Sequence, residues 1–402
     1  MDITKKFIYF FGFVFIFFCL CPYIRLLGFN TTTQPNALVF SLIPLFLIKL
    51  KSLPREIYLY FIVFLFATIV LFTSSMTFLE VRDWANYLSL ILITVASYKL
   101  LCYIKGLNYK FFYSIIVLWF LTGFIQTYIY GKFLSFLFSK VRGTLVDGRG
   151  VTSLSTEPTY YGLIMSLFFI IYLINGWHKR SKLLGLIIIF QIIFFSKSTT
   201  SIGLLFISIC GYSLIQLLKL NVKRTITFVL GFLGVFLLLS QTKEYYEETR
   251  VYEIVELVAE KPELILAADY SVAERINHMV FPVVGLVENY FLPHGYGQFD
   301  EYLTEKKESG EYQIFFSHQF FKAALRILSG HGKAFFELGF VGLFISIGIL
   351  MSFWFGLRLP EFLFAFIFFY LLLFAALPFM TATVPFILGN ILYIRKQKLS
   401  KT

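Results

Sequence analysis

Apolar runs of membrane-spanning length recur along the whole chain. Residues 7–20, 57–72, 111–130 and 226–239 carry no charge. With their flanks they reach the roughly 20 residues that a helix needs to span a bilayer. Backbone groups inside lipid must be paired within the segment, which favours helices. Only 14% of the residues are charged, against roughly 25% in soluble domains. We therefore predict an all-α polytopic integral membrane protein.

Polar breaks divide these runs into about twelve predicted transmembrane helices. They are residues 6–24, 37–50, 57–73, 85–103, 111–130, 158–175, 183–196, 200–218, 225–240, 334–354, 362–377 and 379–394. The helix interiors hold almost no ionisable residues in this division. The four cysteines show neither the number nor the spacing of a disulfide framework or metal site.

Clusters of basic residues recur at every second predicted loop. The basic clusters are Lys49, Lys51 and Arg55; Lys99, Lys105 and Lys110; Lys179, Arg180 and Lys182; Lys219, Lys223 and Arg224; and Arg395, Lys396 and Lys398. Under the positive-inside rule these segments are cytoplasmic, and so are both termini. The net charge of +12 then reflects topology, and we expect no nucleic-acid partner.

The predicted organisation has three parts. Residues 1–240 form helices 1–9, with a polar outside loop near 131–157. Residues 241–333 form one large outside loop, helical and amphipathic in its first half and glycine-broken in its second. Residues 334–402 form helices 10–12 and a basic tail. Loops as long as the second part are uncommon and are often functional.

The stretch GRGVTSLSTEPTYYG (residues 148–162) concentrates polar groups before the sixth predicted helix. Arg142 and Arg149 offer bidentate donors that match phosphate oxygens, so we expect them to bind a lipid diphosphate. Glu157 precedes Pro158, which suits the first turn of a helix. Glu157 could cap that helix through its dipole or act chemically, and the arginines could equally be solvated loop charges.

The large loop supplies a second set of candidates. Arg275 and His278 share a face if SVAERINHMV is helical. In PHGYGQF, a glycine-bent turn presents Tyr296 as a candidate sugar-stacking surface next to His294. His278, His294, His318 and His331 are candidate general acids or bases, although a surface or packing role is the commoner one for such histidines.

His331 stands out because Gly330 and Gly332 flank it where the chain re-enters the membrane. Lys333 and Glu337 do not share its helical face but are expected at the same entrance. Lys197 lies in the polar break FSKSTTSIG and is a candidate phosphate contact, though a tight turn explains that break better. No metal or nucleotide motif is present. We therefore expect metal-independent group transfer on a lipid-borne substrate, with no cofactor.

Four elements together resemble the bacterial Wzy family of O-antigen and exopolysaccharide polymerases, and more loosely the sister O-antigen ligases. They are LSTEPTYYG, similar to a Ser-x-Glu-Pro-Ser element; FSKSTTSIGLL, similar to a Ser-rich turn; AERINHMV with PHGYGQF; and SGHGKAFFELGFVGL. They occur in the family's order. Gly332 departs from the pattern, since relatives often have Asn or Ser after the histidine.

The resemblance implies a bundle similar to the GT-C fold, in the bacterial inner membrane, with an active site facing the periplasm under the large loop. Such enzymes polymerise undecaprenyl-diphosphate-linked oligosaccharides, so donor and acceptor glycans, membrane lipids, a flippase and a chain-length regulator are the expected partners. Arg275, with Arg142 or Arg149, would bind the leaving diphosphate. His331 or Glu157 would orient or deprotonate the acceptor hydroxyl.

Two alternatives remain open from the sequence. An O-antigen ligase, which transfers glycan to a lipid A core, would use similar outside arginines and histidines. A lipid-linked oligosaccharide flippase or other transporter is a non-enzymatic alternative, but transporters commonly carry charges or broken helices at mid-membrane. The nearly uncharged predicted helices therefore favour surface chemistry over transport.

Overall fold

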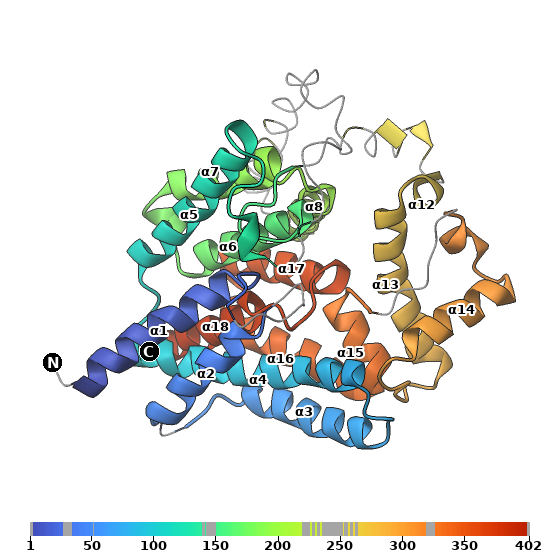
Figure 1. Cartoon of the computed structure of the whole chain (residues 1–402), viewed down its shortest axis with the longest axis horizontal. Helices are drawn as coiled ribbons and strands as arrows, with labels where there is room; N and C mark the ends of the chain where they lie inside the picture. The colour runs from blue at the N-terminus through green and yellow to red at the C-terminus, as the bar shows by residue number, and fades with distance from the viewer. Residues whose placement is uncertain are drawn as a thin grey trace. The chain divides into compact units, whose positions relative to one another are not determined.

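The structure, a computed structural model, describes residues 3–26, 34–50, 52–138, 141, 150–218, 264–318 and 326–399, with isolated positions between 226 and 261. The regular elements in these ranges are all helical (Figure 1). In chain order they are α1 (Ile3–Leu20), α2 (Asn36–Leu47), α3 (Glu56–Phe72), α4 (Phe78–Ile104), α5 (Tyr109–Tyr128), η1 (Ser135–Leu137), α6 (Pro158–Ile174), η3 (Trp177–Lys179), α7 (Lys182–Phe190), η4 (Gln191–Phe195), α8 (Thr199–Leu218), α12 (Ile265–Ala268), α13 (Tyr270–Glu288), α14 (Phe299–Ser309), η6 (Gln313–Phe316), α15 (Gly330–Leu338), η7 (Gly339–Gly342), α16 (Leu343–Trp354), α17 (Pro360–Ala375) and α18 (Thr383–Leu399).

Four of the described helical segments are long and apolar enough to cross a membrane. They are α4, α5, α8 and the run Gly330–Trp354, which contains α15, η7 and α16. Shorter apolar helices, α2, α3, α6, α7 with η4, and α17, accompany them. The predicted all-α class is thus confirmed for the described residues, and these helices are compatible with a membrane protein. Twelve spans and a GT-C arrangement stay predictions.

Several helix boundaries differ from the predicted ones. α4 begins at Phe78 instead of residue 85, because Thr77 and Glu80 form a capping box at its start. The predicted helix 334–354 begins at Gly330 and is interrupted at Gly339, which has φ +60°. The large loop is also more helical than expected, since α13 and α14 occupy much of its second half. The ninth predicted helix lies outside the described residues.

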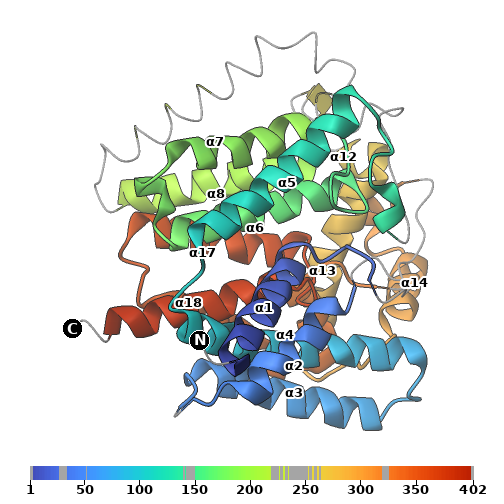
Figure 2. The same ribbon diagram turned by 60° about the vertical axis from the view of Figure 1, so that its left-hand side comes forward.

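The chain divides into two compact units. Unit 1 contains residues 1–112, 263–355 and 373–402, and unit 2 contains residues 113–262 and 356–372. Each unit combines segments that are distant in the sequence. In unit 1, α4 packs against α2, α3 and α18, as Figures 1 and 2 both show. In unit 2, α6 packs against α7, η4 and α8.

The α4–α18 contact is close because small residues meet there. A Cβ added at Gly389 of α18 would lie 2.5 Å from Ser97 Cβ and 2.7 Å from the Thr94 carbonyl oxygen. Small residues at a helix interface allow backbones to approach in this way in membranes. α4 is thereby held along its length as the central helix of unit 1.

α13, α14 and α15 share a small apolar core in unit 1. Its buried members are Phe281, Phe299, Tyr302, Leu303, Ile327 and Phe336, with Tyr312, Phe315 and Phe316 packed against them. Phe336 belongs to α15, which starts the candidate span Gly330–Trp354. The part of the large loop from α13 to α14 is therefore a folded layer on this span.

Candidate functional site

The two loop motifs that carry the predicted chemistry pack directly against each other. α13, which contains AERINHMV, contacts α15, which contains the start of SGHGKAFFEL. At Gly332 an added Cβ would lie 2.8 Å from the His278 carbonyl oxygen and 3.1 Å from Pro282 Cγ. The glycine that departs from the family pattern is therefore the residue that lets the helices approach.

His278 is a packing residue in this contact. Its ring is 1% exposed, and its Nδ1 accepts a hydrogen bond from the Leu328 amide at 3.2 Å. Burial, and then the charge of Arg275, lower the pKa of His278 to about 3. The ring is therefore neutral near pH 7, with Nδ1 as an acceptor, and is not a general acid there. Arg275, one turn earlier, is half-buried.

His331 is fully buried, contrary to its expected place at an open entrance. Its exposure is 0%, and its ring lies among Phe335, Phe374 and Phe379. Ser346 Oγ lies 2.9 Å from His331 Nδ1. An added Cβ at the neighbouring Gly330 would lie 2.7 Å from the Leu377 carbonyl oxygen. The flanking glycines allow close packing and do not open the site.

A buried cluster of charges lies close to His331 in the sequence, and sequence reasoning missed one of its members, Asp83. Lys333 Nζ lies 2.9 Å from Asp83 Oδ1 and 3.0 Å from Glu337 Oε1. The Tyr87 hydroxyl donates to Glu337 Oε2 at 2.7 Å. Asp83, Lys333 and Glu337 are 6%, 6% and 4% exposed. We call these three residues the buried triad.

The buried triad corrects the expectation that helix interiors are nearly uncharged. Asp83 lies within α4, because this helix starts earlier than predicted, and the other two lie in the candidate span Gly330–Trp354. Charges inside membrane helices are costly and usually have functional or pairing roles. The nearly uncharged predicted helices were an argument against a transporter, and the buried triad weakens that argument.

The turn PHGYGQF is glycine-bent as predicted, with φ of +88° at Gly295 and +76° at Gly297. Its aromatic residue is not an open stacking surface, however. Tyr296 is 1% exposed, its hydroxyl donates to the Ala67 carbonyl oxygen of α3 at 2.9 Å, and its ring lies 6.5 Å from that of Tyr87. The tyrosine anchors the turn to α3.

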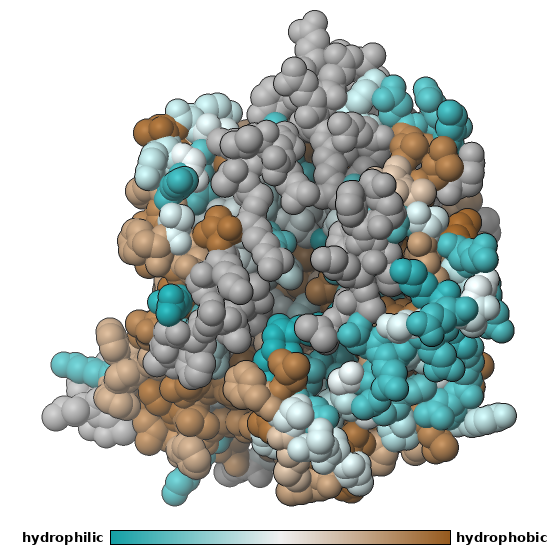
Figure 3. Space-filling view, turned by 45° about the vertical axis from the view of Figure 1, so that its right-hand side comes forward, coloured by the Kyte–Doolittle hydropathy of each residue, from teal (hydrophilic) through white to brown (hydrophobic). Residues whose placement is uncertain are grey.

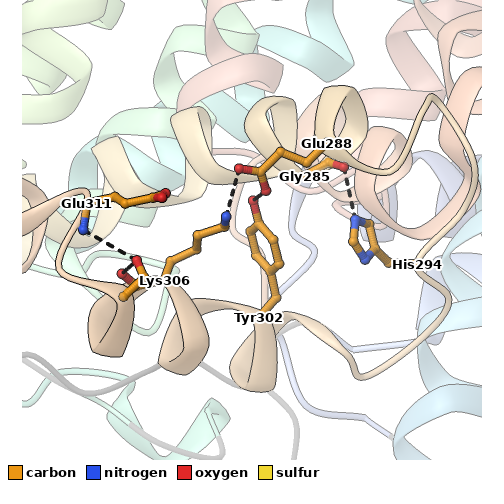
Figure 4. Close-up of polar contacts among 7 residues, drawn as sticks. Gly285, Glu288, His294, Tyr302, Lys306 and Glu311 are labelled. Carbon is orange, nitrogen blue, oxygen red and sulfur yellow. Dashed lines mark hydrogen bonds and ion pairs between the residues drawn. The ribbon is translucent and has the colours of Figure 1, made fainter.

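His294 also has a structural role. Its Nε2 lies 3.0 Å from the Gly285 carbonyl oxygen (Figure 4). Its ring stacks on Phe336 with centroids 4.2 Å apart. The same view shows Glu288 bonded to Lys306 and to the Tyr302 hydroxyl, both at 2.7 Å. Burial acts to raise the pKa of Glu288, but these hydrogen bonds outweigh it and hold the pKa below its usual range.

In unit 2 the two hydroxyl-rich motifs also meet. Val151 N donates to the Phe195 carbonyl at 2.8 Å, and a Cβ at Gly162 would lie 2.6 Å from Ser201 Oγ. Gln126 bonds to both backbone groups of Ser153: its Oε1 accepts from the Ser153 amide at 2.6 Å, and its Nε2 donates to the Ser153 carbonyl at 3.1 Å. Residues 152–156 are all at most 6% exposed. The polar stretch 152–156 is therefore buried and does not form an open surface.

Glu157 and Lys197 border this network. Glu157 precedes α6, whose first residue is Pro158 as predicted, and its side chain makes no capping hydrogen bond. It is half-buried, so a chemical role stays open. Lys197 has φ +44° in the turn before α8, and burial lowers its pKa. Ser198 Oγ accepts from the Ser201 amide at 3.2 Å, which fits the turn interpretation of this motif.

Arg142 and Arg149 lie outside the described residues. His318 is buried, at 9% exposure. Within the described ranges, no three side chains of the metal-ligating types come close enough to hold an ion. The structure thus gathers Arg275, His278, His294, Tyr296, His331, Lys333 and Glu337 in unit 1, and Glu157 and Lys197 in unit 2. No protein-family model matches the sequence, and no curated protein is significantly similar to it.

Proposed function

We propose that this protein is a membrane-embedded glycosyltransferase that polymerises lipid-diphosphate-linked oligosaccharides, as the Wzy-type polymerases do. The observation that carries the proposal is the packing of α13 on α15, which brings the arginine-bearing motif AERINHMV and the motif SGHGKAFFEL into one compact unit. In this proposal both termini are cytoplasmic, as the positive-inside pattern favours, and α13–α14 lie on the periplasmic side of a bacterial inner membrane.

Arg275 has the leading role in the proposed reaction. An acceptor sugar hydroxyl attacks the anomeric carbon of the donor glycan, the bond from that carbon to the diphosphate oxygen breaks, and the lipid diphosphate leaves. Negative charge builds on the diphosphate as this bond breaks. A guanidinium group placed beforehand stabilises that charge. Arg142 and Arg149 are the further candidates for this contact.

Glu157, which lies in unit 2, stays a sequence-based candidate for the acceptor of the hydroxyl proton. His278 and His331 are poor candidates for the base, because the Nδ1 lone pair of His278 already accepts from the Leu328 amide and the His331 ring is enclosed by phenylalanines. The Glu157 side chain is half-buried at the start of α6. Its chemistry fits a general base.

The test is complementation of a strain that lacks the gene, with surface lipopolysaccharide separated on a gel. Restoration of a ladder from a single-unit band supports the polymerase. Arg275→Ala should leave the single-unit band, and Arg275→Lys should restore little, because lysine lacks the bidentate fork. Glu308→Ala, at an exposed position of α14, is the matched control and should give a normal ladder. A normal ladder from Arg275→Ala would remove Arg275 from the mechanism.

A lipid-linked oligosaccharide flippase is the second candidate, favoured by the buried triad inside candidate spans. The same strain separates it from the polymerase. Unpolymerised units that accumulate on the cytoplasmic side indicate transport. Lipid-linked polymer that accumulates without reaching the surface indicates the ligase.

A further inference from the structure

The chain between α13 and α14 makes an unusual turn directly beside the break in the candidate span Gly330–Trp354. Tyr290 and Phe291 follow each other with φ of +52° and +63°, a region that bulky residues rarely adopt. The turn leaves Tyr290 85%, Phe291 48% and Leu292 56% exposed. We call Tyr290–Leu292 the aromatic tip.

The backbone around the aromatic tip is bonded to the interrupted span. The amide of Phe340 donates to the Phe291 carbonyl at 2.9 Å, and the amides of His294 and Gly295 donate to the carbonyls of Phe336 and Glu337 at 3.0 and 3.3 Å. The chain from Phe291 to Gly295 therefore supplies partners to α15 carbonyls that the helix break would leave unsatisfied. Backbone polar groups at membrane depth must be satisfied within the protein, and these bonds do so at the break.

The position of Phe340 gives the depth of the tip. Trp354 ends the span, and the chain from there to Phe340 rises about 20 Å along the helix axis. A hydrocarbon core is about 30 Å thick. If Trp354 lies at one interface, Phe340 and the tip bonded to it lie about 10 Å below the other interface, in the outer third of the hydrocarbon core.

The surface next to the tip supports the same depth. Phe340, Ile347, Leu350, Met351 and Trp354 are all exposed and recur at helical spacing, so they form an apolar stripe down the span. Ile69 and Phe72 at the end of α3, which contacts α16, are also exposed. The tip continues this apolar surface upward and is not an isolated patch.

On the side of the tip away from the apolar stripe, the surface is charged. Glu288 is the one charged residue in the sequence from 286 to 296, and it is paired with Lys306 of α14. α14 itself is rich in exposed Lys and Glu and contributes to the hydrophilic area on the right of Figure 3. An aromatic residue between an apolar stripe and such a charged layer is typical of a membrane interface.

We propose that the aromatic tip inserts into the lipid leaflet and forms a re-entrant anchor that holds α13 and α14 against the membrane. Tyr290 lies with its ring among the upper acyl chains and its hydroxyl directed toward the headgroups. Phe291 and Leu292 contact acyl chains. The inference goes beyond the proposed polymerase activity, because lipid contact at this position requires no glycan substrate.

The experiment is site-directed spin labelling in vesicles of phosphatidylethanolamine and phosphatidylglycerol. Single cysteines are placed by Tyr290→Cys and Leu292→Cys in a chain whose four cysteines are replaced by alanine. Collision rates with oxygen and with a water-soluble nickel chelate are compared with those at Ile69→Cys on α3 and Glu308→Cys on α14. Labels at 290 and 292 should resemble 69, with oxygen favoured several-fold over nickel.

The inference is overturned if the labels at 290 and 292 resemble the label at 308. Spin–spin broadening at these positions would also overturn it, since a second copy of the chain would then cover the tip. A chain with native cysteines gives an independent measurement, in case the alanine background does not fold. There, Tyr290→Trp should add fluorescence that brominated lipids quench, and Glu308→Trp should add fluorescence that they do not.

Discussion

Replacing Lys333 by methionine tests whether the buried triad is a dry ion cluster. Methionine keeps most of the volume of the lysine stem and removes its charge. Lys333 is the shared partner of Asp83 and Glu337, with both carboxylates within 3.0 Å of its Nζ. Tyr87 still donates to Glu337 after the change, and Arg82 lies 3.6 Å from Asp83. Removal of the lysine therefore leaves two buried acids with only partial compensation.

The expected loss of stability follows from that geometry. Removing one partner of a buried ion pair costs about 3–5 kcal/mol, because a charge stays buried without its counter-charge. A triple variant, Asp83→Asn, Lys333→Met and Glu337→Gln, removes all three charges together and should recover most of this loss. Lys307→Met, at an exposed position of α14, is the matched control and should change stability by less than about 0.5 kcal/mol.

The assay is unfolding of the purified protein in mild detergent by a graded denaturant, followed by fluorescence and size-exclusion chromatography. Lys333→Met should unfold at clearly lower denaturant than the parent protein, and the triple variant should lie near the parent. Equal stability of Lys333→Met and Lys307→Met would refute the reasoning, since water would then have to solvate the acids. A triple variant as unstable as Lys333→Met would also contradict it.

Three further outcomes are expected. Gly332→Ala should destabilise unit 1 by about 1–3 kcal/mol, because its Cβ meets the backbone of α13. Gly203→Ala is the control and should not destabilise the protein, because an added Cβ there meets nothing within 4 Å. An equal Tm for the two variants would contradict the close packing at Gly332. Glu157→Gln should keep the protein folded, because glutamine has nearly the same size and keeps an acceptor oxygen, but it should abolish the glycan ladder. A full ladder would limit Glu157 to a structural role. The pKa of Glu288 is held below its usual range in the folded protein, so its bonds stabilise α14 above the ordinary glutamate pKa and are lost as pH falls through the folded value. The protection of α14 amides against exchange should therefore fall as the pH drops below the ordinary glutamate range, and Glu288→Gln should remove that pH dependence.

Sequence patterns predicted several helices closely. α3, α6 and α8 lie within a residue or two of their expected bounds, because prolines, charges and hydroxyl clusters mark where those apolar runs stop. α4 was predicted too short, since Arg82 and Asp83 looked like residues of an outside loop. The capping pair Thr77 and Glu80 was readable in the sequence and would have placed the start correctly.

The candidate site was harder to predict because burial depends on distant partners. The spacing of Lys333 and Glu337 indicates an ion pair on one helical face, but Asp83 comes from another part of the chain. The histidines likewise looked alike in the sequence. His278 and His331 are buried by phenylalanines and backbone from several helices. A local sequence pattern does not predict this kind of burial.

The origin of the buried triad in two distant segments has a consequence for how the protein is made. α4 is synthesised early and carries Asp83, whereas Lys333 and Glu337 emerge in the final quarter of the chain. Asp83 and Lys333 lie within the first two turns of α4 and of α15, near the starts of these helices. If both helices cross a membrane, we expect the start of α4 to stay near the interface until α15 has been synthesised and Lys333 pairs with its acid.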